Sequence, residues 1–267
     1  MSGRVNVSTP DRKGTEVVRG SVDQEARRQA LAELLTASGT LRIEELAERF
    51  SVSTMTVRRD LQALEDEGLA RRVRGGAISG AAPFSTREHR SERAKGLIAA
   101  KLATLVPSGG VGICMDASTT VSTLAATMPE AENLSVVTSG IETFATLSRN
   151  RRVHAYLTGG QKDPNAGSLI GPVASAALKQ FSFARAFLSA AGVDPSFGTS
   201  EFSAEECEIK RLMAELSDHV VLAIDAQKLG AGAAARCLPW TGIDLVVTEL
   251  PVDDPRLDPY REHVELL

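Results

Sequence analysis

The sequence predicts an α/β protein in two parts, a winged helix-turn-helix followed by a mostly parallel α/β domain. Three helix-like segments and a basic, glycine-containing segment occupy residues 24–79. From residue 94 to 267, short apolar runs alternate with helical stretches, a pattern typical of a parallel sheet covered by helices. The polar stretch 80–93 indicates a linker. Residues 1–23 lack a sustained apolar period, which predicts a flexible N-terminal extension.

The composition is that of a globular protein whose basic charge is concentrated near its start. The 267 residues are 43% hydrophobic, enough for two cores and too apolar for a mostly disordered chain. The net charge of −4 argues against nucleic-acid binding over the whole surface. Within residues 1–93, however, Lys and Arg outnumber Asp and Glu, and the balance reverses in the rest. A localised basic face is therefore compatible with an acidic average.

Cysteine usage and hydropathy indicate the cytoplasm. The three cysteines, Cys114, Cys207 and Cys237, are too far apart for a metal-binding or redox CxxC pair, and no signal peptide is evident. No apolar run approaches the roughly 20 residues needed to cross a bilayer. We therefore expect a cytoplasmic protein with no membrane contact, no bound metal and no cofactor.

The first two helices are predicted from apolar residues that share one helical face. Residues 23–39 place Ala30, Leu31, Leu34 and Leu35 on such a face and end at Gly39, a residue type that commonly terminates helices. Residues 43–50 repeat this pattern. Residues 51–53 then leave room only for a turn, as between the two helices of a helix-turn-helix.

A third helix is expected to begin after Ser53, whose hydroxyl can cap its first turn. Val57, Leu61 and Leu64 fall at helical spacing and should face the first two helices, and Gly68 should end the helix. The side chains left facing outward are those of Thr54, Met55, Arg58, Arg59 and Gln62.

Residues 69–79 combine apolar residues, arginines and two glycines, which is typical of a short basic β-hairpin. In a winged helix-turn-helix, the third helix enters the major groove and wing arginines neutralise phosphates. An isolated Arg-Arg pair is more often a solvated helix face, here with Glu65 or Asp66 as partners, but the helices, turn, cap and hairpin together favour DNA contact. The expected DNA-binding residues are Ser53, Thr54, Met55, Thr56, Arg58, Arg59, Gln62, Arg71, Arg72 and Arg74.

In the second domain, each predicted strand ends in small or polar residues. Ligands of open α/β sheets bind beyond the carboxyl ends of the strands. We therefore expect five clusters to converge on one edge of the sheet, namely residues 116–120, 138–140, 158–160, 190–192 and 225–228.

The loop at residues 116–120, Asp-Ala-Ser-Thr-Thr, favours an anion site because it precedes a predicted helix. Backbone amides and the hydroxyls of Ser118, Thr119 and Thr120 can donate to a phosphate. Asp116 would repel a phosphate, so it is expected to bind sugar hydroxyls or to orient the loop. The alternative is that Ser118 and Thr119 only cap the helix, for which one hydroxyl is enough.

Two lysines and two glycines are weaker candidates for the same site. Lys210 and Lys228 can supply cations to a ligand, although a lone helical lysine is usually only solvated. Gly159 and Gly160 either permit close backbone approach or simply turn the chain.

Residues 44–77 resemble the N-terminal signature of the DeoR family of bacterial transcriptional regulators, "VS..TVRRDL..LE..G...R..GGA". The resemblance implies a DNA-binding module in residues 24–79 and an effector-sensing domain in the rest. The matching positions are Val52, Ser53, Thr56, Val57, Arg58, Arg59, Asp60, Leu61, Leu64, Glu65, Gly68, Arg72, Gly75, Gly76 and Ala77.

The second domain is similar to the DeoR-family sensor domain, whose fold resembles that of ribose-5-phosphate isomerases and related sugar-phosphate enzymes. Matches include "VVT" at 136–138, "FLSAAGVD" from Phe187, and Glu208 with Lys210. The sequence departs from the family at Ala117, Ser139 and Glu249, where Gly, Asn and Asp are usual. The resemblance implies an effector site formed by Lys95, Asp116, Ser118, Thr119, Thr120, Thr138, Ser139, Gly159, Gly160, Gly192, Lys210, Asp225 and Lys228.

Two functions follow from this organisation. The first is a transcriptional regulator, most often a repressor in this family, of a sugar or carbohydrate operon, controlled by a phosphorylated sugar or related metabolite. The second is a sugar-phosphate isomerase or deaminase with an appended DNA-binding domain. An isomerase needs a positioned base, and the "DGAD" and "KGGG" loops that ribose-phosphate isomerases share are absent from the sequence. The regulator is therefore the better reading, with no catalytic residue.

Its expected partners are double-stranded operator DNA, the small-molecule effector and further copies of the same chain. Two recognition helices that read two half-sites gain affinity and specificity that one lacks, so we expect a homo-oligomer. The sequence is compatible with a dimer or a tetramer, with repression or activation, and with an effector that releases or strengthens DNA binding.

Overall fold

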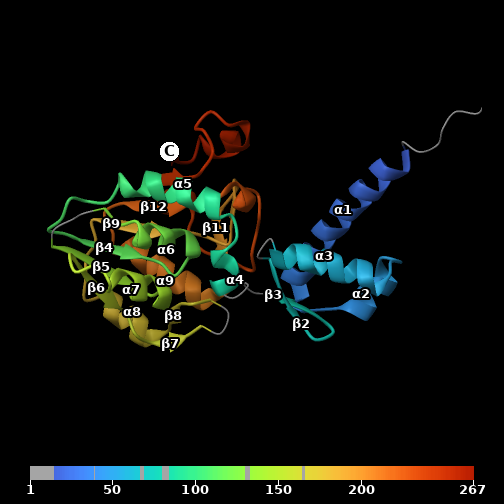
Figure 1. Cartoon of the computed structure of the whole chain (residues 1–267), viewed down its shortest axis with the longest axis horizontal. Coiled ribbons are helices and arrows are strands. Elements are labelled where there is room, and N and C mark those ends of the chain that lie inside the picture. The colour runs from blue at the N-terminus through green and yellow to red at the C-terminus, as the bar shows by residue number, and fades with distance from the viewer. Residues whose placement is uncertain (1–14, 39, 67–68, 80–83, 130–132, 164–165) are drawn as a thin grey trace, which may run out of the picture.

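A computed structural model of the chain describes residues 15–38, 40–66, 69–79, 84–129, 133–163 and 166–267. A smaller helical part at the N-terminal end lies beside a larger α/β part (Figure 1). The smaller part contains α1 (Thr15–Ser38), α2 (Ile43–Arg49), α3 (Thr54–Asp66), β1 (Thr40–Arg42), β2 (Ala70–Val73) and β3 (Gly76–Ser79).

The N-terminal part is a winged helix-turn-helix, as predicted. Val57, Leu61 and Leu64 of α3 are buried against α1 and α2, and the Ser53 hydroxyl accepts a hydrogen bond from the Thr56 amide at 3.1 Å. β2 and β3 form the predicted hairpin, and β1 pairs with β3 to give the strand order β1-β3-β2. Gly75 makes the hairpin turn with φ +87°, a backbone conformation that favours glycine.

A buried carboxylate that the sequence analysis did not single out links α1 to α3. Asp60 is 1% exposed and pairs with Arg27 Nε at 2.6 Å and Arg28 Nε at 3.4 Å. A buried carboxylate is costly unless it is paired and hydrogen-bonded, and both arginines come from α1. The pairing therefore fixes the orientation of α3 relative to α1.

Two expectations about the segments flanking this domain are corrected. Helix α1 begins at Thr15, so residues 15–23 are not an irregular extension. The absence of an apolar stripe along a segment does not exclude a helix there, because a helix that has already formed extends by further residues at low cost. Residues 1–14, Gly39 and Gly68 lie outside the described residues, and α3 ends at Asp66.

The expected linker at 80–93 is largely helical where it is described. α4 spans Phe84–Glu88 and α5 begins at Glu92 and ends at Ala103. Phe84 gives this segment an apolar anchor beside Gly167 of the larger part. Ser91 joins the two helices with φ 50° and ψ 34°, an unusual conformation for a residue other than glycine.

The larger part is built on a seven-stranded parallel sheet with the order β15-β14-β12-β9-β4-β5-β6, which confirms the predicted α/β class. Its strands are β4 (Gly112–Met115), β5 (Leu134–Thr138), β6 (Val153–Leu157), β9 (Arg185–Leu188), β12 (Val220–Ala223), β14 (Leu245–Val247) and β15 (Glu265–Leu266).

Helices cover both faces of this sheet. Residues of α5, α6 (Thr119–Ala126) and α7 (Ile141–Leu147) pack on one face, against side chains such as Ile113 and Met115. Residues of α8 (Pro172–Leu178) and α9 (Ala204–Glu215) pack on the other, against side chains such as Cys114. Side chains alternate between faces along β4, so its near-continuous apolar run is explained by burial on both sides.

Several short elements complete the larger part. β7 pairs with β8, and β10, β11 and β13 form a small antiparallel sheet. Their bounds are β7 (Gln161–Lys162), β8 (Leu169–Ile170), β10 (Gly192–Asp194), β11 (Gly198–Glu201), β13 (Ala235–Arg236), and the 3₁₀ turns η1 (Ala226–Lys228), η2 (Trp240–Gly242) and η3 (Pro255–Tyr260). Among the described residues, none of the helices has the length and hydropathy required to cross a membrane.

Candidate functional site

The face of α3 opposite its core carries the predicted DNA-contacting residues. Thr54, Arg58 and Arg59 are exposed, and Met55 is 56% exposed. Glu65 and Asp66, the alternative partners of these arginines, have other partners. Glu65 accepts the backbone amide of Arg72 at 2.9 Å, and Asp66 accepts a side-chain hydrogen bond from Gln62 at 2.9 Å. The arrangement leaves the α3 arginines facing solvent, as an interface with DNA phosphates and base edges requires.

Other predicted DNA-contacting residues are partly engaged within the domain. The Arg72 guanidinium donates to Gln62 Oε1 and lies 3.9 Å from a Glu65 oxygen. Arg71 is half-buried, and Thr56 is half-buried with its hydroxyl 2.9 Å from that of Ser53. Arg74, next to the hairpin turn, is an exposed wing arginine and therefore the best placed of the three to reach a phosphate.

Substitution of Arg74 by alanine is expected to weaken binding to specific and random DNA alike, because a phosphate contact carries no sequence information. The slope of log affinity against log salt should fall by about 1. Fluorescence titrations of both DNAs at two salt concentrations measure this, with the exposed Arg151→Ala of the larger part as control. An effect confined to one DNA sequence would place Arg74 on a base instead.

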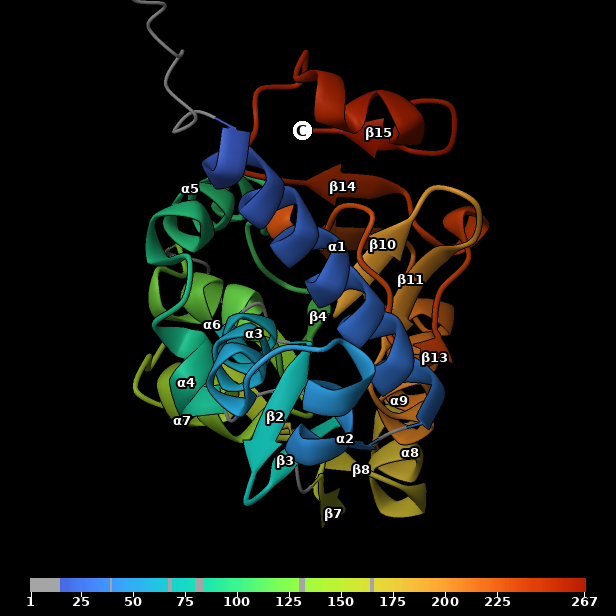
Figure 2. The same ribbon diagram turned by 90° about the vertical axis from the view of Figure 1, so that its right-hand side faces the viewer.

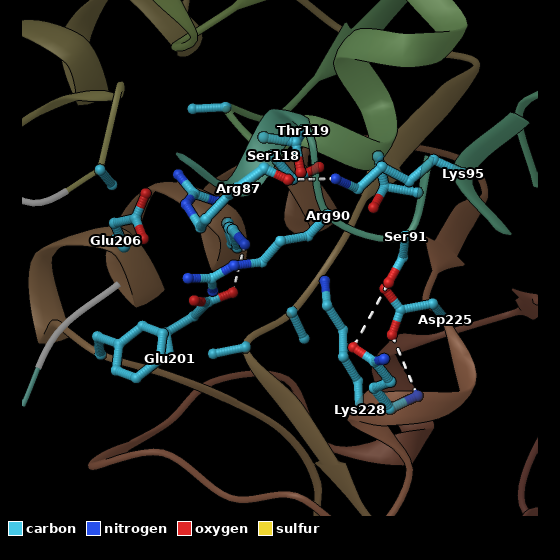
Figure 3. A pocket seen from close by; sticks show the side chains of 18 of the residues that line it. Arg87, Arg90, Ser91, Lys95, Ser118, Thr119, Glu201, Glu206, Asp225 and Lys228 are labelled. Atoms are coloured by element: carbon cyan, nitrogen blue, oxygen red, sulfur yellow. Dashed lines mark hydrogen bonds and ion pairs between the residues drawn. The ribbon is translucent and has the colours of Figure 1, made fainter. Parts of the chain in front are cut away.

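A pocket lies at the carboxyl ends of the central strands (Figure 3). Its lining includes the end of α3, the segment between α4 and α5, and the loop before α6. Among the predicted effector residues, those that line it are Lys95, Ser118, Thr119, Thr120, Lys210, Asp225 and Lys228.

The 116–120 loop both caps α6 and faces the pocket. The Ser118 hydroxyl accepts the Val121 amide at 3.2 Å, and the Ser118 amide donates to Asp116 Oδ1 at 2.9 Å, so this residue is used locally. The Thr119 and Thr120 amides lie in the first helical turn, where intrahelical acceptors are lacking. The Thr120 hydroxyl is buried without a hydrogen-bond partner among the described residues. These groups are suited to an anion.

Asp116 and Lys210 form the buried frame of the site. Lys210 Nζ donates to Ser189 O at 2.7 Å and to Glu201, and lies 3.1 Å from Asp116 Oδ2. Burial opposes its charge, but Glu201 and Asp116 raise the pKa of Lys210 well above its usual value. Burial likewise acts against ionisation of Asp116, whose pKa is nevertheless lowered by Lys210 and by hydrogen bonds from Ser118 and Ser189. Asp116 therefore orients the loop, one of its two predicted roles.

Lys95 and Lys228 are two lysines of the pocket lining whose pKa is lowered. Burial, reinforced by the charge of Lys228, lowers the pKa of Lys95 to about 8, and its ammonium donates to the carbonyls of Arg87 and Glu88. Lys228 Nζ donates to the Ser189 hydroxyl at 2.8 Å, and burial lowers its pKa too. Two desolvated ammonium groups that repel each other gain stabilisation from a shared anion.

Carboxylates lie on both sides of the pocket, Glu206 across from Lys95 and Lys228 and Asp225 beside these two lysines (Figure 3). Burial, followed by the charge of Glu201, raises the pKa of Glu206 to about 7. Asp225 caps η1 by accepting the Gln227 amide at 3.1 Å. Carboxylates suit sugar hydroxyls, which donate hydrogen bonds to them. The pocket thus presents anion-binding groups and hydroxyl-binding groups to one ligand.

The five predicted clusters all follow strands of the parallel sheet and lie at its carboxyl edge, but only three of them, 116–120, 190–192 and 225–228, line the pocket. The second and third clusters follow β5 and its neighbour, the edge strand β6, and do not contribute to the lining. There the Thr138 hydroxyl accepts the Gly140 amide at 3.0 Å, and Gly160 packs against Ile170 and Ala174. Gly192 lies against the backbone of Ala231. The predicted residues that do not line the pocket are Asp116, Thr138, Ser139, Gly159, Gly160 and Gly192.

The sequence analysis missed several pocket residues. Arg87, Arg90 and Ser91 belong to the segment interpreted as a linker, where a run of charged residues resembled ordinary solvent-exposed sequence. Its unusually high arginine content was the available signal. Glu201 and Glu206 had no such signal, because β11 is short and the spacing of Glu206 is ordinary for a helix surface. Gln227 lies within the predicted 225–228 cluster but was not selected.

Two family models match the chain. Residues 27–81 match the DeoR-like helix-turn-helix domain, and residues 90–250 match the DeoR C-terminal sensor domain. The chain is 32% identical over 228 residues to the HTH-type transcriptional regulator GolR of Listeria innocua, covering 84% of this chain and 89% of that protein. It is also 32% identical over 232 residues to the glycerol-3-phosphate regulon repressor of Escherichia coli, covering 85% and 92%.

A more distant relative is the HTH-type transcriptional regulator IolR of Bacillus subtilis, 27% identical over 243 residues, with 89% of this chain and 96% of that protein covered. Among solved structures, ribose 5-phosphate isomerase A from Methanocaldococcus jannaschii aligns with a TM-score of 0.38 and 13% identity. That alignment covers 51% of this chain and 54% of the isomerase.

Proposed function

Because the chain belongs to the DeoR family of transcriptional regulators, we propose that it represses a sugar or carbohydrate operon and responds to a phosphorylated sugar or related metabolite. The site that carries this proposal is the pocket of Figure 3. It joins the unpartnered Thr120 hydroxyl and two lysines of lowered pKa to the carboxylates of Glu206 and Asp225. A molecule that carries both a phosphate and hydroxyls matches both kinds of group.

The relatives support this class of effector. The E. coli relative is, by its name, the repressor of a glycerol-3-phosphate regulon, and a phosphorylated polyol has the two kinds of group that the pocket accommodates. The GolR, glycerol-3-phosphate and IolR relatives are transcriptional regulators, which favours regulation over an isomerase or deaminase activity of the second domain.

We place the protein in the cytoplasm, where it meets operator DNA as a dimer or a tetramer. One winged helix-turn-helix reads one half-site, and two linked copies are needed for the affinity and specificity of a typical operator. The residues proposed to contact DNA are Thr54, Met55, Arg58 and Arg59 of α3 together with Arg74 of the wing.

The proposal is tested by thermal unfolding of the protein with matched pairs of compounds. The pairs are glycerol and glycerol 3-phosphate, ribose and ribose 5-phosphate, and hexoses with their phosphates. A ligand at about 100 times its dissociation constant stabilises the folded protein by roughly 2.7 kcal/mol. We expect a rise in melting temperature for one phosphorylated member and little or none for its parent. Equal shifts for phosphorylated and parent compounds would rule out a phosphate-dependent site.

The affinity for that phosphorylated compound is expected to fall as the pH rises from about 7 to about 9. Lys95, with a pKa of about 8, loses its positive charge over this range, and Glu206, with a pKa of about 7, becomes negative at its lower end. Anion binding keeps Lys95 protonated, so the complex holds more protons than the free protein and forms less readily as protons become scarce.

Calorimetric titrations across this range measure the pH effect, because the phosphate itself is already largely a dianion above its second pKa of about 6. Lys95→Met should bind more weakly and with a flatter pH profile. If Lys95→Met keeps the full wild-type dependence of affinity on pH, Lys95 is excluded as a contact of the anion.

A further inference from the structure

We propose that the acidic end of the recognition helix α3, residues Glu65 and Asp66, couples the effector pocket, which Asp66 lines, to the DNA-binding face through Arg90. This inference rests on the proposed function, because it concerns how the same pocket acts on DNA binding. It adds a specific route between the two domains.

The geometry places both domains at one pocket. Asp66, the last residue of α3, lines the pocket together with Arg87 of α4 and Arg90 of the segment between α4 and α5. Figure 2 shows α3 in front of the α/β part and next to α4. The recognition helix therefore ends where the proposed effector would bind.

Arg90 is the residue that an effector phosphate and α3 would share. Its Nη2 atom is buried and has no hydrogen-bond partner among the described residues, although a guanidinium normally uses its donors when it is buried. Burial lowers the pKa of Arg90, and the nearby charges of Asp66 and Glu65 act against that decrease. The carboxylates of α3 thus attract Arg90 while one of its donors is left for a ligand.

The same two carboxylates also hold residues of the candidate DNA-binding face. Asp66 Oδ1 accepts from Gln62 Nε2 at 2.9 Å, one turn earlier on α3. Glu65 accepts the backbone amide of Arg72 at 2.9 Å and lies near its guanidinium, in strand β2 of the wing. A change in the surroundings of this acidic pair therefore reaches both the recognition helix and the wing.

Binding of a phosphate would change those surroundings in a defined direction. The phosphate draws the Arg90 guanidinium to itself and adds negative charge beside Asp66. Both effects weaken the attraction between the end of α3 and the pocket, so the effector favours a state in which α3 is released from it. Because coupling between two ligands is reciprocal, operator DNA must alter effector affinity by the same factor.

Asp66→Asn tests the coupling, since it removes the charge and keeps the shape. The probe is whichever phosphorylated compound stabilises the wild-type protein, and the DNA is an operator selected from a random pool by the protein itself. Without the probe, Asp66→Asn should shift operator affinity in the same direction as the saturating probe shifts the wild type. The probe should then have a much smaller further effect, and should bind the variant several-fold more tightly because Arg90 no longer has a competing carboxylate.

Glu48→Gln is the matched control, because it removes one exposed negative charge from the same domain without touching the pocket. It should retain the wild-type response to the probe. An Asp66→Asn protein with the full wild-type response would overturn the proposed route, even though the pocket still senses the effector.

A double-mutant cycle with no effector separates this inference from the proposed function. Arg90→Met, Asp66→Asn and the double variant are compared for operator affinity. If Arg90 and Asp66 interact, the two effects are non-additive, and this result holds whatever the effector is. Strict additivity contradicts the inference. Absence of any thermal shift with the phosphorylated compounds contradicts the proposed effector class instead.

Discussion

Arg58→Ala and Arg59→Ala are each expected to weaken operator binding. The loss of binding free energy should be about 1–3 kcal/mol where the arginine contacts a base edge. Both side chains are exposed on α3, opposite the buried Val57 and Leu61, so the substitutions should leave the fold intact. A bidentate arginine contact with guanine is a common specific contact in the major groove, and alanine cannot replace it. Titration of the selected operator and of a random duplex measures the loss.

The two DNAs separate the possible roles of these arginines. Loss of a contact to a base reduces the preference for operator over random DNA, whereas loss of a contact to phosphate weakens binding to both DNAs and lowers the salt dependence. Arg149→Ala, an exposed substitution in the larger part, is the control for a simple change in net charge. If neither α3 variant changes affinity at either of two salt concentrations, α3 is not the recognition helix.

The second large effect is expected in the pocket. Lys228→Met, or Thr119→Val combined with Thr120→Val, should abolish the effect of the phosphorylated compound on DNA binding and leave operator affinity without it nearly unchanged. Met removes a pocket ammonium, and Val keeps the branched shape of Thr without its hydroxyl. The Thr120 hydroxyl has no protein partner among the described residues, so its removal leaves no such group unsatisfied.

Operator titrations with and without the compound measure this second effect, alongside thermal shifts that report binding directly. Lys179→Met, an exposed position at the end of α8, should respond like the wild type. A ligand alters an equilibrium only through its unequal affinity for the two states, so a protein that cannot bind it cannot respond. A full response in both pocket variants would move the sensing site elsewhere.

Strongly periodic segments were predictable from the sequence alone. Val57, Leu61 and Leu64 defined the buried face of α3, and apolar runs such as 112–115 marked strands buried on both sides. The two-residue strand β15 and the antiparallel β10-β11-β13 sheet were not predictable, because strands this short carry no measurable period and depend on tertiary pairing. The predicted start of the first helix was wrong for a related reason, because residues 15–23 have no apolar stripe.

The pocket was predictable only where a loop follows a central strand. Residues 116–120 and 225–228 follow β4 and β12, which are near the middle of the sheet, and both line the pocket. Thr138 and Gly159 follow β5 and its neighbour, the edge strand β6, and this strand order is not encoded locally. Lys210 was predicted to contact the ligand, but its ammonium pairs with Glu201 and Asp116. These partners lie elsewhere in the sequence, so the pairing could not be predicted from local pattern.

The most direct test is the operator-binding curve of the wild-type protein with and without the phosphorylated compound that stabilises it. If the protein is an effector-controlled regulator, the compound should change operator affinity by about 5- to 150-fold, and operator DNA should change affinity for the compound by the same factor. An operator affinity that stays the same at a saturating concentration of a compound that demonstrably binds the pocket would contradict this account.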